Sequence, residues 1–174
     1  LTGMPSAPNR SPVVCRTVRR SKSNSLLATM AASGLAAAAL AWACNIPLEI
    51  IVRGLESARP APGRLEVHHY GGLAVIDDTY NANPASMKAA LDMLADCPGR
   101  RIAILGGMGE LGEGAGLMHA EVGAYARAKG IDLLLAVGAF HEHTVNGFGE
   151  GPVHAFADQE ALLAALPSLV AGPA

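Results

Sequence analysis

The 174-residue chain has few aromatic residues (4%), few charged residues (16%) and three cysteines. With so few aromatics, the apolar half of the sequence depends on small and aliphatic residues, which favour tightly packed helix-on-sheet layers over a β-sandwich. The net charge of −2 argues against nucleic acid or a membrane surface as a partner. Cys15, Cys44 and Cys97 lie far apart, without disulfide or metal-ligand spacing, which predicts reduced thiols and a cytoplasmic protein.

One stretch resembles a secretory signal or a membrane span. Residues 26–52 contain a single charged side chain and follow a basic segment. Two features oppose that interpretation, because the stretch is rich in alanine rather than leucine, and Asn45 and Pro47 interrupt it. We therefore predict two successive helices, the second over 46–55 and closed by Gly54. Residues 1–22 carry proline, serine and arginine without periodicity and are predicted to be disordered or non-native.

From Gly63 onward, short apolar runs alternate with helical patterns. The expected strands are 64–70, 73–76, 102–105, 133–137 and 153–156, and the expected helices are 84–96, 119–129 and 158–169. This alternation predicts an α/β fold, an open and mostly parallel sheet with helices on both faces, preceded by a short helical segment. Right-handed crossovers would bring the loops after Asp77, Gly106 and Gly138 to one rim, where open α/β sheets bind ligands.

Two adjacent carboxylates, Asp77 and Asp78, end the second expected strand. Such a pair can hold ribose hydroxyls, a metal or a substrate amine, although Asp is also common in turns. Tyr80, Asn81 and Asn83 follow with a ring face and two amides that can bracket a nucleobase. Asn83 has a second explanation, as the N-cap of the helix that begins at the next residue, a proline.

A glycine-rich turn, Gly106-Gly107-Met108-Gly109, follows the next strand. Its glycines allow close backbone approach to a phosphate or a substrate, and a tight turn before a helix explains them equally well. The order is not G-x-G-x-x-G, and no G-x-x-x-x-G-K-[ST] occurs in the chain. A self-sufficient phosphate-transfer site is therefore not visible. Glu110 is a substrate contact or a solvated charge.

Two further side-chain types have both a functional and an ordinary interpretation. Arg64 is a surface residue or a phosphate or ribose contact, since a guanidinium can donate two hydrogen bonds to phosphate oxygens. The six histidines do not form one metal-binding spacing, and His141-Glu142-His143 is interpreted as an incidental cluster in a loop.

Four segments, in this order, resemble the Mur ligase family. They are Gly63-Arg64-Leu65-Glu66, the stretch 75–87 (VIDDTYNANPASM), the stretch 105–112 (LGGMGELG), and His119. The D-D-x-Y-N-A-N-P string within the second segment is the most specific. The resemblance runs from about residue 25 to about residue 169, and it is strongest to members that join D-alanyl-D-alanine to UDP-N-acetylmuramoyl-tripeptide.

The resemblance implies a domain organisation and a reaction. Members have a UDP-sugar domain, an ATPase domain and a Rossmann-like third domain. Residues 23–58 would be the helical end of the ATPase domain, and 59–174 the third domain, truncated at its end. ATP would phosphorylate the acceptor carboxylate, the amine would attack the acyl phosphate, and magnesium would neutralise the phosphates. The whole protein would then act in peptidoglycan synthesis.

The resemblance also implies roles for individual residues. Arg64 would contact the nucleotide's ribose or phosphates, and Asp77 or Asp78 would hold the ribose. The nucleotide side of the cleft would be lined by Tyr80, Asn81 and Asn83. The incoming dipeptide would face the glycine-rich loop, namely Gly106, Gly107, Met108 and Glu110. No catalytic residue and no metal ligand is expected in this chain.

Several family features differ or are missing. The P-loop, the magnesium-binding glutamate and the carbamylated lysine of the ATPase domain are missing, so we expect no ATP turnover by this chain alone. Ser23 precedes Asn24 where members have histidine, and Gly107 stands where they have aspartate. The sequence stops before the family's last strands and its Lys-Gly-Ser motif. The alternatives are a related ligase of the cyanophycin-synthetase or folylpolyglutamate-synthase type, and a non-catalytic nucleotide-binding module.

Overall fold

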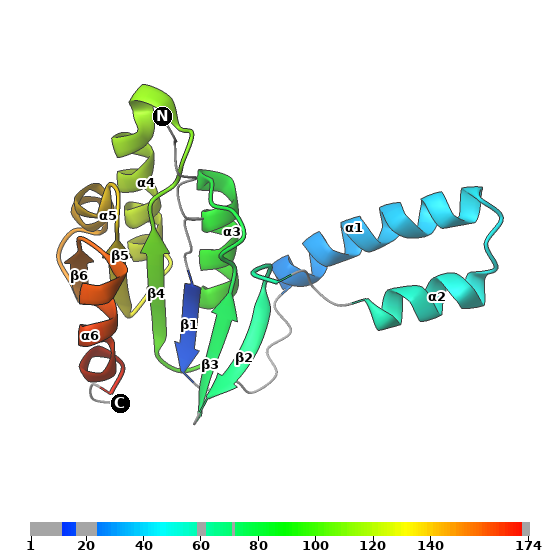
Figure 1. Ribbon diagram of the computed structural model, residues 1–174, viewed down its shortest axis with the longest axis horizontal. Coiled ribbons are helices and arrows are strands. Elements are labelled where there is room, and N and C mark those ends of the chain that lie inside the picture. Colours follow the sequence, from blue (N-terminus) through cyan, green and yellow to red (C-terminus); the bar gives the residue numbers. More distant parts are fainter. Residues whose placement is uncertain (1–11, 17–23, 59–61, 71, 172–174) are drawn as a thin grey trace, which may run out of the picture.

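The computed structural model describes residues 12–16, 24–58, 62–70 and 72–171. These residues form a six-stranded sheet in the order β2-β3-β1-β4-β5-β6, flanked by helices (Figure 1). The strands are β1 (Pro12–Arg16), β2 (Glu66–Tyr70), β3 (Leu73–Asp77), β4 (Arg101–Gly106), β5 (Leu133–Val137) and β6 (Val153–Phe156). The helices are α1 (Asn24–Ala43), α2 (Leu48–Ser57), α3 (Pro84–Ala95), α4 (Ala115–Ala128), α5 (His141–Phe148) and α6 (Gln159–Val170), with a short 3₁₀ turn η1 (Gly112–Gly114) before α4.

The strand directions bring three loops to one rim. β4, β5 and β6 are parallel neighbours, and β1 runs antiparallel to both β3 and β4. β3 therefore points the same way as β4, although β1 separates them. The carboxyl ends of β3, β4 and β5 all lie at the upper end of the sheet in Figure 1. The predicted α/β fold is confirmed, with parallel pairing over β4, β5 and β6, whereas β1, β2 and β3 pair antiparallel and make the sheet mixed rather than mostly parallel.

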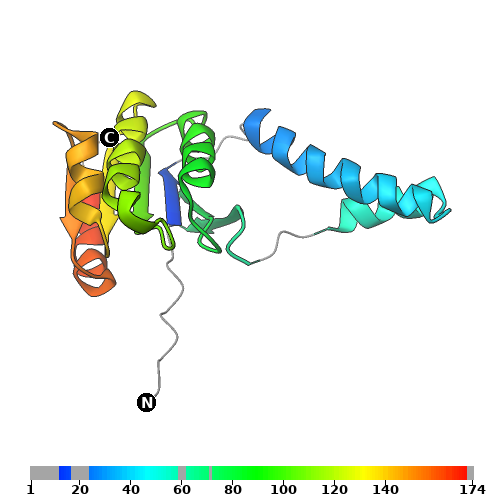
Figure 2. The same ribbon diagram turned by 90° about the horizontal axis from the view of Figure 1, so that it is seen from above.

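Apolar residues cover both faces of the sheet and form two cores. Along β4, Ala103 and Leu105 face α3, α4 and α5, whereas Ile102 and Ile104 face α6. All five residues of β5 are buried, as expected of a central parallel strand covered on both sides. Figure 2 shows the helices on opposite sides of the sheet, so the predicted layering is confirmed.

Local sequence explains where α3 begins. The Asn83 side chain accepts a hydrogen bond from the Ser86 backbone N–H at 2.9 Å, and the Ser86 hydroxyl accepts one from the Asn83 N–H at 3.1 Å. Pro84 occupies the first helical position, where its missing N–H costs nothing. This reciprocal cap is worth about 1 kcal/mol. The predicted N-cap at Asn83 is confirmed, as is that at Asp158 for α6.

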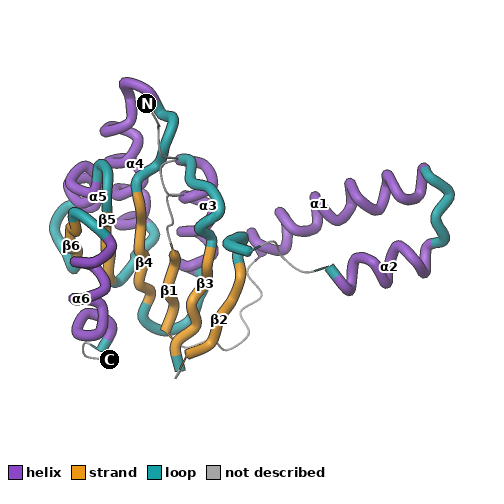
Figure 3. Tube along the Cα trace, viewed as in Figure 1, coloured by secondary structure: helices purple, strands orange, loops and turns teal. Residues whose placement is uncertain are grey.

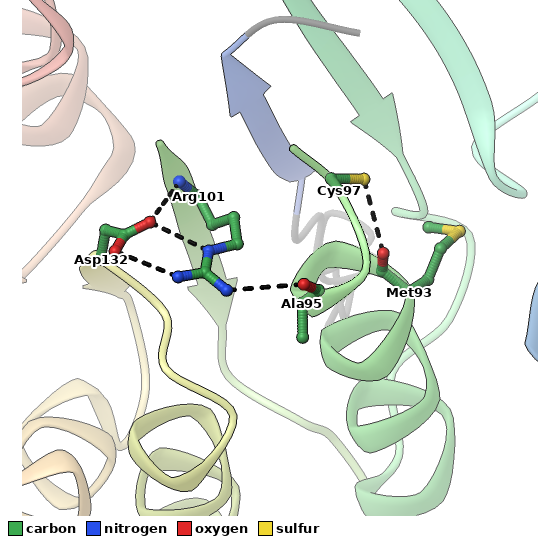
Figure 4. A network of polar contacts seen from close by, with 5 residues as sticks. All are labelled: Met93, Ala95, Cys97, Arg101 and Asp132. Atoms are coloured by element: carbon green, nitrogen blue, oxygen red, sulfur yellow. Dashed lines mark hydrogen bonds and ion pairs between the residues drawn. The ribbon is translucent and has the colours of Figure 1, made fainter. Parts of the chain in front are cut away.

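An ion pair joins the start of β4 to the start of β5 (Figure 4). Asp132 accepts hydrogen bonds from the Arg101 backbone N–H at 2.7 Å and from its Nε at 3.0 Å. Burial raises the pKa of Asp132, but the hydrogen bonds and charge of Arg101 outweigh burial and hold the pKa below its usual value. The stabilisation is therefore present above the ordinary carboxyl pKa and is lost as the pH falls through the lowered one.

Residues 1–22 were predicted to be disordered or non-native, and disorder is wrong for residues 12–16, which form β1. Residues 1–11 and 17–22 lie outside the described part of the chain, and the non-native alternative stays a prediction. The strand fills the place between β3 and β4, whose backbone groups need hydrogen-bond partners there.

A second prediction of irregular structure is wrong. His141-Glu142-His143 was predicted to lie in a loop but forms the first turn of α5. The helix is short and its exposed surface is polar, so only the buried Thr144 and Phe148 mark its inner face.

Three element boundaries also differ from the prediction. α4 begins at Ala115, one turn before the expected start at His119. α2 continues through Gly54 to Ser57. β2 begins only at Glu66, because Leu65 adopts a left-handed conformation (φ 52°) that interrupts the extended backbone.

Helices α1 and α2 form the two predicted helices of the N-terminal segment. Figure 3 shows them as a hairpin that extends away from the β2 edge of the sheet. Large apolar side chains on both helices are exposed, among them Leu35, Leu40, Trp42 and Leu48. In the part of the chain that the structure describes, no helix is long and apolar enough to cross a membrane.

Candidate functional site

The segment that precedes β2 is fastened to the β3–α3 loop. The Tyr80 backbone N–H donates a hydrogen bond to the Gly63 carbonyl at 2.8 Å. Gly63 has φ 70°, and a Cβ there would lie 3.0 Å from Thr79 Oγ1, so glycine is required. The Arg64 guanidinium stacks over the Tyr80 ring with its Cζ 4.0 Å from the centroid. Arg64, which precedes β2, and Tyr80, which follows β3, thus share one surface at the rim.

Asp78 is the carboxylate that belongs to this surface. Burial, the largest influence, raises its pKa above the usual value, and the charge of Asp77 adds to this. A hydrogen bond from the Leu65 backbone N–H and the charge of Arg64 act in the opposite direction without cancelling the rise. Asp78 is therefore a half-buried carboxylate whose charged form is disfavoured, close to an arginine.

Asp77 and Asp78 do not act as a pair. Successive side chains of an extended backbone point to opposite sides of the sheet. Asp78 lines a small hollow with Asn81 and residues of α3, whereas Asp77 lines a separate hollow on the α6 side. Asp77 also accepts a hydrogen bond from the Thr79 backbone N–H at 3.1 Å, as in an Asx turn. The paired carboxylates expected from the sequence are split between two faces.

Removing the charge of Asp78 should raise stability at neutral pH. Because the folded-state pKa is raised, the carboxyl group stabilises the fold only when protonated, and this contribution is lost as the pH rises through the raised pKa. Asp78→Asn keeps the shape and an acceptor for the Leu65 N–H. We expect it to be more stable than the native chain at pH 7, by at most about 1 kcal/mol after solvent screening.

Urea denaturation at pH 7 and at pH 3 measures this difference. The gain should shrink at the lower pH, where the native carboxyl group is itself protonated. Glu150→Gln removes a charge from an exposed position and serves as the control, with no change expected at either pH. An Asp78→Asn chain less stable than native at pH 7 would contradict the electrostatic account.

The rest of the β3–α3 loop faces solvent. Tyr80 is 61% exposed, and Asn81 and Asn83 are exposed as well. Asn81 accepts a hydrogen bond from the Ala82 N–H at 2.8 Å, and the Asn83 oxygen is used by the helix cap. The amide nitrogens of both residues point to no partner in the described part of the chain. They are available as donors beside the Arg64–Tyr80 stack.

The glycine-rich loop after β4 packs on the neighbouring loop after β5. A Cβ on Gly107 would lie 2.6 Å from the Ala139 carbonyl oxygen, so no side chain fits there without a shift. Gly106 and Gly107 are buried, and Met108 is only 3% exposed and belongs to the core. Glu110 is exposed and has φ 60°. Of the four expected substrate contacts, Glu110 alone presents its side chain to solvent, whereas the Met108 side chain points inward.

His119 holds this loop in place, a function that sequence analysis did not identify. Its Nε2 accepts a hydrogen bond from the Met108 backbone N–H at 2.7 Å. Its Nδ1 lies 2.6 Å from the Ala115 carbonyl oxygen, to which it donates. The ring is 1% exposed and stacks on Phe140 with centroids 4.7 Å apart. A single histidine in a helical pattern does not predict these contacts, because its partners lie in the loop after β4, at the start of α4 and in the loop after β5.

The two hollows at the rim differ in size. The hollow beside Asp78 has an interior volume of about 10 Å³, room for about one water molecule. The hollow on the α6 side measures about 370 Å³ and is lined by Asp77, Thr79 and apolar residues of the sheet. The Arg64–Tyr80–Asp78 surface is therefore open rather than enclosed, as expected of one wall of a cleft.

The sequence matches a known family over this same region. Residues 63–173, well over half of the chain, match the family described as Mur ligase, glutamate ligase domain, and the chain belongs to that family. It is 41% identical over 144 residues to the UDP-N-acetylmuramoyl-tripeptide–D-alanyl-D-alanine ligase of Escherichia coli K12, covering 80% of this chain and 31% of that one. The ligase of the same name from Mycobacterium tuberculosis H37Rv is 40% identical over 114 residues, 61% of this chain and 22% of that one.

Solved structures agree with these relatives. A MurF crystal structure from Acinetobacter baumannii superposes with a TM-score of 0.66 at 37% identity, covering 79% of this chain and 29% of that one. MurF from Thermotoga maritima, solved in complex with ADP, gives a TM-score of 0.58 at 27% identity, covering 67% and 27%. The chain thus spans about a third or less of the length of these relatives.

Proposed function

We propose that this chain is part of an ATP-dependent ligase that adds D-alanyl-D-alanine to UDP-N-acetylmuramoyl-tripeptide in peptidoglycan synthesis. The observation that carries the proposal is the rim at the carboxyl end of β3. There, the motif residues Arg64, Asp78 and Tyr80 form one surface in a chain 41% identical to a ligase of that name. Within the whole enzyme, this region would close over ATP and receive the dipeptide.

The nucleotide would bind to the Arg64–Tyr80–Asp78 surface. The stacked guanidinium of Arg64 keeps N–H donors for ribose or phosphate oxygens. Asp78 is better placed than Asp77 to accept from a ribose hydroxyl, because it lies beside Arg64 while Asp77 faces the other side of the sheet. The exposed Tyr80, Asn81 and Asn83 would line the base side. The ADP complex of the Thermotoga relative is consistent with a nucleotide-binding function.

The dipeptide would meet the glycine-rich loop. Gly106, Gly107 and Met108 are buried, so the dipeptide would contact this loop at its exposed end, where Gly109 and Glu110 lie. The exposed carboxylate of Glu110 would attract the dipeptide's ammonium group. His119 would act as a positioning residue, because it fixes the Met108 N–H.

The phosphate chemistry would depend on residues outside this sequence. Magnesium, when bound with ATP, would neutralise the phosphate charge. The sequence contains no P-loop to hold the phosphates.

We propose that α1 and α2, within residues 23–58, are the last helices of the ATPase domain and that their exposed apolar side chains pack against the rest of that domain. Because ATP and UDP-linked precursors are cytoplasmic, the protein would act in the cytoplasm.

Calorimetric titration of the chain with ADP tests the proposal. We expect one ADP site, weakened about tenfold by Arg64→Ala, as for the loss of one charge-assisted hydrogen bond. The control is Arg53→Ala, since Arg53 is exposed on α2 away from the rim.

We expect no ATP hydrolysis by the chain alone. D-alanyl-D-alanine should bind in preference to glutamate or aspartate, and the reverse preference would favour a related ligase. Failure of ADP to bind would exclude the nucleotide function.

A further inference from the structure

Three potential metal-binding side chains converge on the β2–β3 hairpin, on the side of the sheet away from Asp78. Glu66 begins β2 and is paired in register with Asp77, which ends β3, and His68 lies two residues farther along β2 on the same face. One ligand atom from each residue lies within 4.8 Å of the other two, and all three residues are partly buried. The distance between His68 Nε2 and Glu66 Oε2 is 3.7 Å.

The cluster brings two carboxylates together. Two carboxylates placed directly opposite each other on neighbouring strands repel. Among the described residues, no lysine or arginine forms an ion pair with Glu66 or Asp77, and His68 is the sole ion-pair partner of Glu66. The nearby Arg64 is stacked on Tyr80 and acts on Asp78. A bound cation would remove the repulsion.

We propose that Glu66, His68 and Asp77 form a binding site for a divalent transition-metal ion such as zinc. An imidazole with two carboxylates suits zinc, whereas magnesium prefers oxygen ligands only. Ligand atoms around zinc at about 2.0–2.2 Å lie about 3–4 Å apart, so small side-chain rotations close the site. The hollow of about 370 Å³ that His68 and Asp77 line admits the ion and its water ligands. The ion would link the edge strand β2 to β3, independently of the proposed ligase function.

Zinc titration of the chain, freed of metal with a chelator, tests this proposal. We expect the native chain to bind one more zinc ion than His68→Gln or Glu66→Gln, or to bind it at least about tenfold more tightly. The matched control is His69→Gln, because His69 is exposed on the same strand and faces the opposite side. Zinc should also raise the melting temperature of the native and control chains but not of the two variants.

Equal zinc affinity and stoichiometry in His68→Gln and the native chain would overturn the proposal, as would an equal loss in His69→Gln. Other histidines on α5 and β6 can bind zinc weakly, and the difference between variants separates that background from the site. The ADP titration is a separate measurement. If the native chain binds ADP but no zinc at this site, the metal site alone is rejected. If the native chain binds zinc but no ADP, the nucleotide function alone is rejected.

Discussion

Gly147→Ala should destabilise the chain by about 3 kcal/mol, a large share of the 5–15 kcal/mol typical of a folded domain. Helices α4 and α5 cross with their backbones in direct contact. A Cβ on Gly147 would collide with the Ala120 carbonyl group, and a Cβ on Gly123 would collide with the Thr144 carbonyl oxygen. Both obstacles are backbone atoms inside helices, so the clash is relieved only if the helices separate. Gly123→Ala should therefore behave in the same way.

Gly54→Ala is the matched control for these two variants. Gly54 also lies within a helix, but nothing is within 4 Å of the place where its Cβ would be. Alanine is the better helix former by about 1 kcal/mol, so this variant should be unchanged or slightly more stable. Urea denaturation monitored by circular dichroism compares the three. A Gly147→Ala chain as stable as the native one would show that the helix contact is looser than described.

The helix contact also bears on the candidate site. The loop between β5 and α5 supports the glycine-rich loop through Ala139 and Phe140. If α5 moves away from α4, both supports move with it. We therefore expect Gly147→Ala to weaken dipeptide binding, even though Gly147 lies in α5 and belongs to neither loop.

His119→Ala should cost about 3 kcal/mol and release the glycine-rich loop. The substitution leaves the buried Met108 N–H without its acceptor and opens a cavity beside Phe140. An unsatisfied buried donor costs about 1–3 kcal/mol, and the lost packing adds to it. The diagnostic measurement is hydrogen exchange at the Met108 amide, which should become fast in the variant while core amides of β5 remain protected.

Two further variants test the assignment of that hydrogen bond. In His119→Gln, the side-chain oxygen can reach the position of Nε2 and accept from Met108, so protection of that amide should be partly restored. His154→Ala, at an exposed position of β6, is the control and should change stability by less than about 0.5 kcal/mol. Unchanged protection of the Met108 amide in His119→Ala would contradict the positioning function of His119.

Local signals in the sequence determined most of the architecture. Apolar runs between turn residues predicted β3, β4, β5 and β6 to within about two residues. The signal is clearest for β4 and β5, because a buried strand with parallel pairing needs a continuous apolar stretch. Capping residues marked the starts of α3 and α6, since a cap depends on residues only three positions away. The motif strings also identified the family, which the match over 63–173 confirmed.

Tertiary structure alone decided how the polar residues combine. Asp77 and Asp78 are neighbours in sequence, yet strand geometry sends them to opposite faces, so Asp78 joins Arg64 while Asp77 joins Glu66 and His68. The contact of His119 with Met108, 11 residues away, and the place of β1 between β3 and β4 depend on residues that are separated in sequence. Sequence periodicity reports which side of its own element a residue occupies, but packing determines which partner it meets there.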